Sequence, residues 1–114
     1  MARDLSFWKV KGDVRLQNQE IYWALSDEEY VEGLEVLPIS DILNDFHAVF
    51  SDWKADEDNY FEKGDESFEL MSTTQFIRCD CYSLSEDNMN KIIEIMLKYD
   101  CPLYDSAIDV RFEV

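Results

Sequence analysis

The side chains best suited to chemistry are concentrated in one stretch, SDWKADEDNYFEKGDE, which spans residues 51–66 and holds seven carboxylates. Carboxylate oxygens are preferred ligands of Ca²⁺, and an EF-hand loop needs them at alternate positions, with glycine at the sixth. A loop that starts at Asp56 places Phe61 at the glycine position, and one that starts at Asp58 places Lys63 there. This spacing excludes an EF-hand. We therefore predict no metal site and no cofactor, with a loose divalent-cation site as the alternative.

The cysteines and the single histidine are the other residues that could bind a metal or catalyse a reaction. Cys79 and Cys81 form a C-x-C pair and Cys101 stands apart, whereas zinc usually takes four ligands from C-x-x-C pairs or histidines. We expect Cys79 and Cys81 to be small buried residues on a strand, and His47 to lie on the polar side of a helix. The chain also lacks a glycine-rich phosphate loop and the G-x-S-x-G and H-E-x-x-H motifs. We predict that the protein is not an enzyme; a small enzyme or metal-binding domain built on these residues is an alternative.

The charge of the chain restricts its partners. The 114 residues include 26 acidic and 10 basic side chains, which leaves a net charge of −16. Residues 26–66 hold 14 acidic and two basic residues, so most of the negative charge lies in the middle third of the sequence. Such a chain repels nucleic acids and anionic membranes, whose binding needs clustered Lys and Arg. We predict a basic protein partner and a fast, salt-sensitive association with it.

Composition also predicts the class of protein and its compartment. A hydrophobic content of 46% with 14% aromatic residues indicates a folded chain, because disordered chains are poor in aromatics. With three Gly, two Pro and no repeat or linker, residues 1–114 should form a single domain. The sequence shows no signal peptide, no apolar run long enough to span a membrane, and an odd number of cysteines. We therefore expect a soluble cytoplasmic protein.

The elements that position these residues follow from hydrophobic periodicity and capping signals. The clearest is an amphipathic helix over residues 37–53, with an apolar stripe that ends at Trp53 and with Asp41, Asp45 and Asp52 on the opposite side. The other predicted elements are strands at 4–10, 59–61 and 107–114, helices at 17–25, 27–33 and 85–99, and an antiparallel hairpin over 67–83 that turns at Thr73–Thr74. The helix at 27–33 is predicted from the capping-box spacing of Ser26 and Glu29, and the helix at 85–99 from Ser85 as its N-cap.

This order of elements predicts an α+β fold. Strand, helices, strand, strand, helix and strand correspond to the ferredoxin-like βαββαβ pattern, in which helices cover one face of an antiparallel sheet. The extra helix between the first two strands is an insertion on that plan. Phe61 is expected to join the core, and Ile108, Val110, Phe112 and Val114 should form the buried side of a half-buried final strand.

The acidic surface of residues 26–66 is the candidate binding site. Its self-repulsion is a cost that a basic partner would offset, whereas acidity for solubility alone would be spread along the chain. Exposed aromatic residues among polar ones are typical of binding hot spots, and Tyr30 and Tyr60 are the candidates for this role. The predicted partner-binding residues are Asp27, Glu28, Tyr30, Glu32, Asp41, Asp45, Asp52, Asp56, Glu57, Asp58 and Tyr60.

The strand DLSFWKV, the acidic helix LPISDILNDFHAVFSDW and the closing segment SEDNMNKIIEIMLKYDCPLYDSAIDVRFEV resemble bacterial immunity proteins in size, charge and layout. These proteins accompany polymorphic or contact-dependent growth-inhibition toxins and neutralise a toxin domain, often a basic nuclease, that a neighbouring cell delivers. The resemblance implies a cytoplasmic toxin inhibitor whose acidic surface covers the active site or substrate groove of the toxin. The alternative is a DNA-mimic or regulatory protein that blocks a nucleic-acid-binding protein, because the same acidic surface would serve it.

Overall fold

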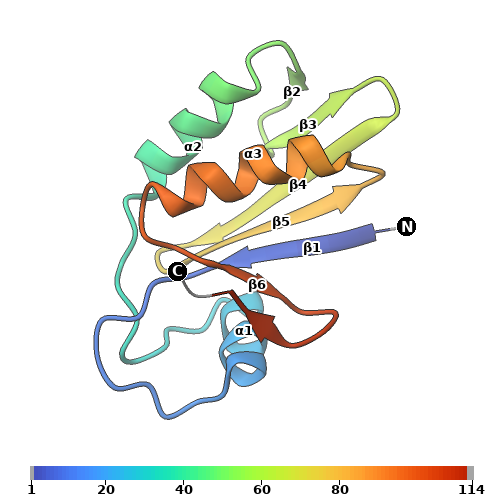
Figure 1. Cartoon of the computed structure of the whole chain (residues 1–114). Helices are drawn as coiled ribbons and strands as arrows, with labels where there is room; N and C mark the ends of the chain where they lie inside the picture. Colours follow the sequence, from blue (N-terminus) through green and yellow to red (C-terminus); the bar gives the residue numbers. More distant parts are fainter. Residues whose placement is uncertain (1, 113–114) are drawn as a thin grey trace.

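The structure of the chain, a computed structural model, describes residues 2–112, with the side chain of Ala2 left aside. Over these residues the fold is mixed α+β, with three helices and one seven-stranded antiparallel sheet (Figure 1). In chain order the elements are β1 (Ala2–Phe7), α1 (Asn18–Ser26), α2 (Ile39–Val49), β2 (Lys54–Ala55), β3 (Tyr60–Lys63), β4 (Glu66–Thr73), β5 (Phe76–Tyr82), α3 (Glu86–Leu97), β6 (Leu103–Asp105) and β7 (Val110–Arg111).

The strands lie in the order β2-β3-β4-β5-β1-β6-β7, and each pairs antiparallel with its neighbours. The predicted hairpin with its tight turn is confirmed as β4 and β5. In β5 the buried residues Ile77, Cys79 and Cys81 alternate with the half-buried Arg78 and Asp80, as expected for a strand with two different faces. The ferredoxin-like βαββαβ layout is not confirmed, because the sheet has seven strands.

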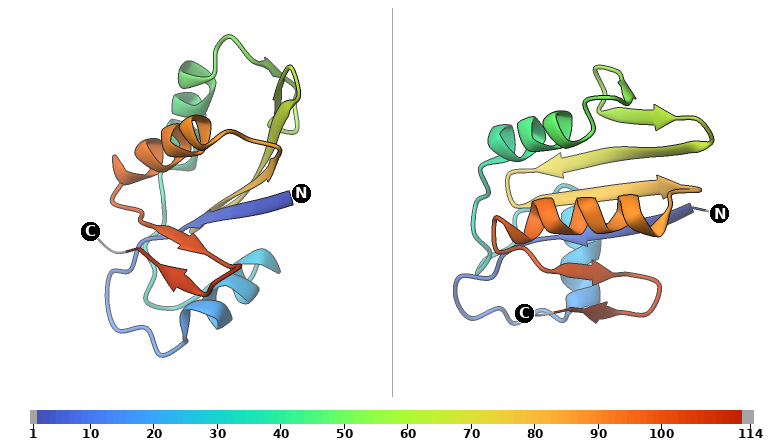
Figure 2. Two further views of the ribbon diagram at one scale, coloured as in Figure 1. Left: turned by 45° about the vertical axis from the view of Figure 1, so that its right-hand side comes forward. Right: turned by 45° about the horizontal axis from the view of Figure 1, so that its top comes forward.

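The helices lie on both faces of the sheet (Figure 2). Ile42 and Phe46 of α2 join the larger core cluster together with α3 on one face. Ile21 and Leu25 of α1 pack around Trp8 on the other face, in a second cluster. The prediction that helices cover one face is therefore confirmed for α2 and α3 and wrong for α1.

The reason for the second cluster is that both sides of the central strands carry large apolar residues. Phe7 joins the core under α2 and α3, while the next residue, Trp8, points to the opposite side. Phe76 and Ile77 at the start of β5 also point to opposite sides of the sheet, Phe76 into the second cluster and Ile77 into the larger one. A sheet with apolar side chains on both faces needs a cover on each, and α1 supplies the second one.

The stretch that carries the most carboxylates is fixed to the core by its aromatic residues. Trp53 is 8% exposed and Phe61 is fully buried, so the prediction that both join the core is confirmed. The rings of Phe61 and Phe68 stack with their centroids 4.8 Å apart, and Phe50 meets Phe68 edge-on at 4.9 Å. The predicted helix over 37–53 is shorter, at Ile39–Val49, and its apolar stripe packs as expected except at Val49, which is 44% exposed.

Two other predicted elements differ from the structure. The helix expected at 27–33 does not form, because Glu28 takes a positive φ of 62° and the backbone of Val31 bonds to the side chain of Gln75 instead. The final strand is reduced to β7 at the sheet edge, and the expected burial is wrong for Ile108, which is 60% exposed. Val110 and Phe112 are also exposed, since no helix lies over this edge among the described residues, and Val114 lies outside those residues.

Candidate functional site

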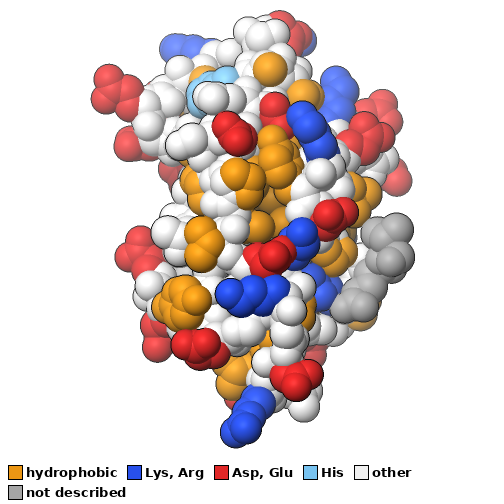
Figure 3. Space-filling view, turned by 90° about the vertical axis from the view of Figure 1, so that its left-hand side faces the viewer, with side chains coloured by type: hydrophobic (Ala, Val, Ile, Leu, Met, Phe, Trp, Pro, Cys, Tyr) orange, Lys and Arg blue, Asp and Glu red, His pale blue; other side chains and the backbone are white. Residues whose placement is uncertain are grey.

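The predicted binding residues do not form one continuous surface. The structure divides them into a loop after α1, the outer side of α2, and the turns around β2 and β3. The loop after α1 and the β2–β3 turn lie at opposite ends of the molecule (Figures 1 and 2). Figure 3 shows one side of the protein, on which acidic side chains occur singly or in small groups among hydrophobic ones.

Part of the acidic side of α2 is neutralised within the chain. Asp45 accepts hydrogen bonds from the hydroxyl of Tyr99 and from Nζ of Lys98, which lies 3.0 Å away. The Tyr99 hydroxyl, followed by the Lys98 ammonium, lowers the pKa of Asp45, and the carboxylate in turn raises the pKa of Tyr99 to about 12. Asp52 pairs with Lys63 in the same way, and this ammonium lowers the pKa of Asp52. These two aspartates join α2 and the segment after it to neighbouring elements.

The carboxylates of the β2–β3 turn include one with a structural role. Oδ1 of Asp56 accepts hydrogen bonds from the backbone N–H groups of Asp58 at 2.9 Å and Tyr60 at 3.1 Å, so this side chain closes its own turn. Glu57 and Asp58 are exposed at the tip, whereas Tyr60 is half-buried on the sheet. Asp41 at the start of α2 is exposed as well.

The loop over residues 27–32 is the most promising of the three groups, and we call it the acidic loop. Asp27, Glu28, Glu29 and Glu32 are all exposed, and none of them has an ion-pair partner within the part of the chain that the structure describes. Tyr30 is 59% exposed in their midst. An exposed aromatic side chain near solvent-exposed carboxylates that have no ion-pair partner is a suitable anchor for a cationic partner.

A buried glutamine fixes the acidic loop in place. Gln75, in the turn between β4 and β5, is 1% exposed, and its amide accepts from the N–H of Val31 at 2.9 Å and donates to its carbonyl at 2.8 Å. The same amide donates to the carbonyl of Leu34 at 3.3 Å. On the other side, the N–H of Lys11 donates to the carbonyl of Gly33 at 2.9 Å. The loop is therefore ordered before any partner arrives, which lowers the entropic cost of binding.

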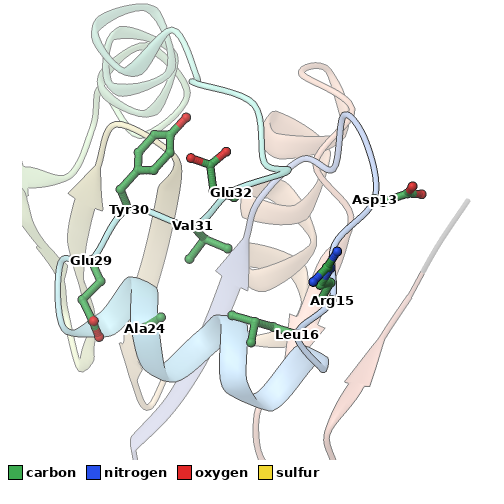
Figure 4. Close-up of a pocket in the computed structure, with 8 residues that line it drawn as sticks. All are labelled: Asp13, Arg15, Leu16, Ala24, Glu29, Tyr30, Val31 and Glu32. Atoms are coloured by element: carbon green, nitrogen blue, oxygen red, sulfur yellow. The ribbon is translucent and has the colours of Figure 1, made fainter.

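The acidic loop borders a shallow hollow of about 320 Å³ (Figure 4). Figure 4 shows that Tyr30 and Glu32 project to the same side of the loop, whereas Glu29 points the other way. The apolar part of the lining comes from Leu16, Ala24, Tyr30 and Val31, and the charged part from Asp13, Arg15, Glu29 and Glu32. An apolar floor with a mainly acidic rim suits a long basic side chain, whose stem is apolar and whose head is charged.

Several residues of this site were not predicted from the sequence. Asp13, Arg15 and Leu16 come from a segment before α1, and no local pattern places them beside the acidic loop. Gly33 offered a signal, since glycine is the residue that tolerates its φ of +93°, and a Cβ at this position would lie only 2.7 Å from the carbonyl oxygen of Asp13. Gln75 offered none, because its role depends on a contact across 44 residues.

Cys79, Cys81 and His47 are in the expected environments. Cys79 and Cys81 are buried, which confirms that part of the prediction, and burial raises the pKa of Cys79. Cys101 is also buried, and its pKa is raised to about 11 by burial. His47 is exposed and lies 3.1 Å from Oδ1 of Asn59. No group of three or more His, Cys, Asp or Glu side chains in the described range is arranged to hold a metal ion.

Comparison of the chain with protein-family models, with curated proteins and with solved structures gave no match. None of the helices formed by residues 2–112 is both long enough and apolar enough to cross a membrane.

Proposed function

We propose that the protein is an immunity protein that binds a basic toxin domain of the nuclease class and blocks its activity. The observation that carries this proposal is the acidic loop, which holds four exposed carboxylates without ion-pair partners in residues 2–112 and the exposed Tyr30, with Glu32 on the same side of the loop as Tyr30 (Figure 4). The net charge of −16 supports it, because fast capture of a basic partner is what a strong negative field achieves.

The proposed mechanism is occlusion. The carboxylates of the acidic loop take the place of substrate phosphates and pair with Lys and Arg side chains of the toxin, while Tyr30 packs on an apolar or cationic part of its surface. The hydrogen bonds between the side-chain amide of Gln75 and the backbone of Val31 keep the loop in one conformation, so little entropy is lost on binding. Exposed Asp41, Glu57 and Asp58 contribute to long-range attraction from other parts of the surface.

The proposal extends to the compartment and to the architecture. The protein would act in the cytoplasm, where a nuclease toxin finds its substrate. The central strands in the order β4-β5-β1-β6, together with α2 and α3 on one face, support a ferredoxin-like βαββαβ unit to which the outer strands and α1 are additions.

The test uses the toxin domain encoded beside the gene for this chain, with binding measured by calorimetry and nuclease activity measured on plasmid DNA. We expect the protein to abolish the nuclease activity at equimolar concentration, and Tyr30→Ala to weaken binding by about 30-fold, as for a hot-spot residue. Glu32→Gln should cost about tenfold, whereas Glu94→Gln, the same change at an exposed position of α3, should leave the affinity within about twofold. An acidic partner, or equal effects of Glu32→Gln and Glu94→Gln, would refute the proposal.

A further inference from the structure

On the face opposite α2 and α3, the cluster under α1 covers the end of the β4–β5 hairpin at Met71 and Phe76, and the rest of β3, β4 and β5 has no helix over it in the described structure (Figure 2). The strand register places Tyr60, Glu69, Asp80 and Asp4 directly opposite one another on β3, β4, β5 and β1. These four side chains thus form one row across this face of the sheet, with Asp4 at the end next to Tyr22 of α1. Three of them in succession are carboxylates.

Opposed like charges destabilise a sheet, and the chain compensates this row only in part. Asp80 pairs with Arg78 at 3.0 Å, and Asp4 accepts hydrogen bonds from the hydroxyls of Tyr22 and of Ser106, the latter at 2.6 Å. Glu69 lies between these two compensated aspartates and Tyr60, and among the described residues it has no ion pair. The centre of the row is therefore left open for a positive charge from outside.

The uncovered face also offers apolar contact area beside the row. Tyr82 is 41% exposed and lies one step along β5 from Asp80 on the same face. Met71, on the other side of Glu69 along β4, is half-buried and packs against the second core cluster, so it marks the limit of the uncovered area. An aromatic side chain next to carboxylates can contact both the stem and the head of a Lys or Arg side chain.

We propose that this sheet face, defined by Tyr60, Glu69, Asp80 and Tyr82, is a second docking surface that binds an arginine- or lysine-rich segment of the protein partner. The proposal rests on the basic partner proposed above but assigns it a contact far from the acidic loop. A second copy of this chain does not fit, because a two-fold axis would bring the carboxylate row of one copy against that of the other. A metal ion does not fit either, since the described side chains form no group able to ligate one.

The test is a titration of isotope-labelled protein with an octa-arginine peptide, followed by NMR, and the same variants are tested against the toxin domain. We expect amide shifts across β3, β4 and β5, and we expect Glu69→Gln to weaken peptide binding at least threefold. Glu69→Lys should abolish binding at this face and at the same time raise the melting temperature, because lysine would oppose Asp80 favourably. If Glu69 had a role in folding alone, Glu69→Lys could not both raise the melting temperature and abolish peptide binding.

Two outcomes would overturn the inference: shifts confined to the acidic loop, or equal peptide affinities for Glu69→Gln and the matched control Glu94→Gln. The result is separable from the proposed function. If Tyr30→Ala weakens toxin binding and Glu69→Lys does not, the inhibitor proposal stands and the second surface is refuted. If Glu69→Lys weakens toxin binding and Tyr30→Ala does not, the acidic loop is refuted as the anchor and the sheet face stands.

Discussion

Replacing Gln75 with alanine should detach the acidic loop from the sheet and destabilise the whole protein. The amide of Gln75 makes three hydrogen bonds to the backbone of Val31 and Leu34, two of 2.8 and 2.9 Å and one of 3.3 Å. Alanine at this position leaves the N–H and carbonyl of Val31 and the carbonyl of Leu34 without that partner. Because Val31 and Leu34 are 3% and 0% exposed, water replaces the lost bonds poorly.

The size of the effect follows from these contacts. A buried hydrogen bond contributes about 1 kcal/mol net, and a partner left unsatisfied costs up to about 3 kcal/mol. Two short bonds and one longer bond therefore predict a loss of about 3 kcal/mol in the free energy of unfolding, out of the roughly 5–15 kcal/mol typical of a domain. Such a loss corresponds to a fall in melting temperature of about 10 °C or more.

The assay is urea unfolding followed by circular dichroism, combined with hydrogen exchange at the amide of Val31. Gln19→Ala is the matched control, because Gln19 is exposed on α1 and should change the unfolding free energy by less than about 0.5 kcal/mol. Exchange at Val31 should accelerate strongly in Gln75→Ala and remain unchanged in the control. A loss below about 1 kcal/mol with protected exchange at Val31 would show that the glutamine does not hold the loop.

Two further predictions concern a glycine and a titrating pair. Gly33→Ala should lower the unfolding free energy by about 2 kcal/mol, because φ is +93° and the new Cβ would lie 2.7 Å from a backbone oxygen. Gly12→Ala, with no atom within 4 Å of the new Cβ, should cost less than half as much in the same urea assay. Tyr99→Phe should raise the pKa of Asp45, measured by carboxyl NMR, because the tyrosine hydroxyl is the main cause of its depression. A carboxyl group with a depressed pKa stabilises the fold at pH values above its pKa in the unfolded chain, and this contribution is lost as the pH falls. The difference in unfolding free energy between wild type and Tyr99→Phe should therefore narrow below about pH 4. An unchanged pKa of Asp45 in Tyr99→Phe would contradict the geometry.

Local signals predicted the elements whose stability is local. The hairpin of β4 and β5, the amphipathic stripe of α2 and the N-cap of α3 at Ser85 all depend on neighbours a few residues apart, and the structure contains each of them. The capping box at Ser26 and Glu29 was misleading, because a contact distant in sequence decides the conformation of this segment. The backbone of Val31 finds its hydrogen-bond partners at Gln75, which outweighs the weak local preference for a helix.

The candidate site was predicted in composition but not in arrangement. The sequence indicated acidic residues around exposed aromatics, and Tyr30 is such a residue. The single continuous surface expected from residues 26–66 is absent from the described structure, because α1 and α2 lie on opposite faces of the sheet. Two of the predicted carboxylates, Asp45 and Asp52, pair with lysines, the first with one distant in sequence and the second with one 11 residues away.

The sequence by itself determined the class of fold and the strong negative charge. Those properties are sums over residues or patterns of period two and 3.6, which require no knowledge of distant contacts. Only the tertiary structure decided which carboxylates stay free and which lie next to each other. Glu69 and Asp80 are 11 positions apart in the chain, yet strand register sets them side by side, and register depends on how whole strands bury their apolar faces.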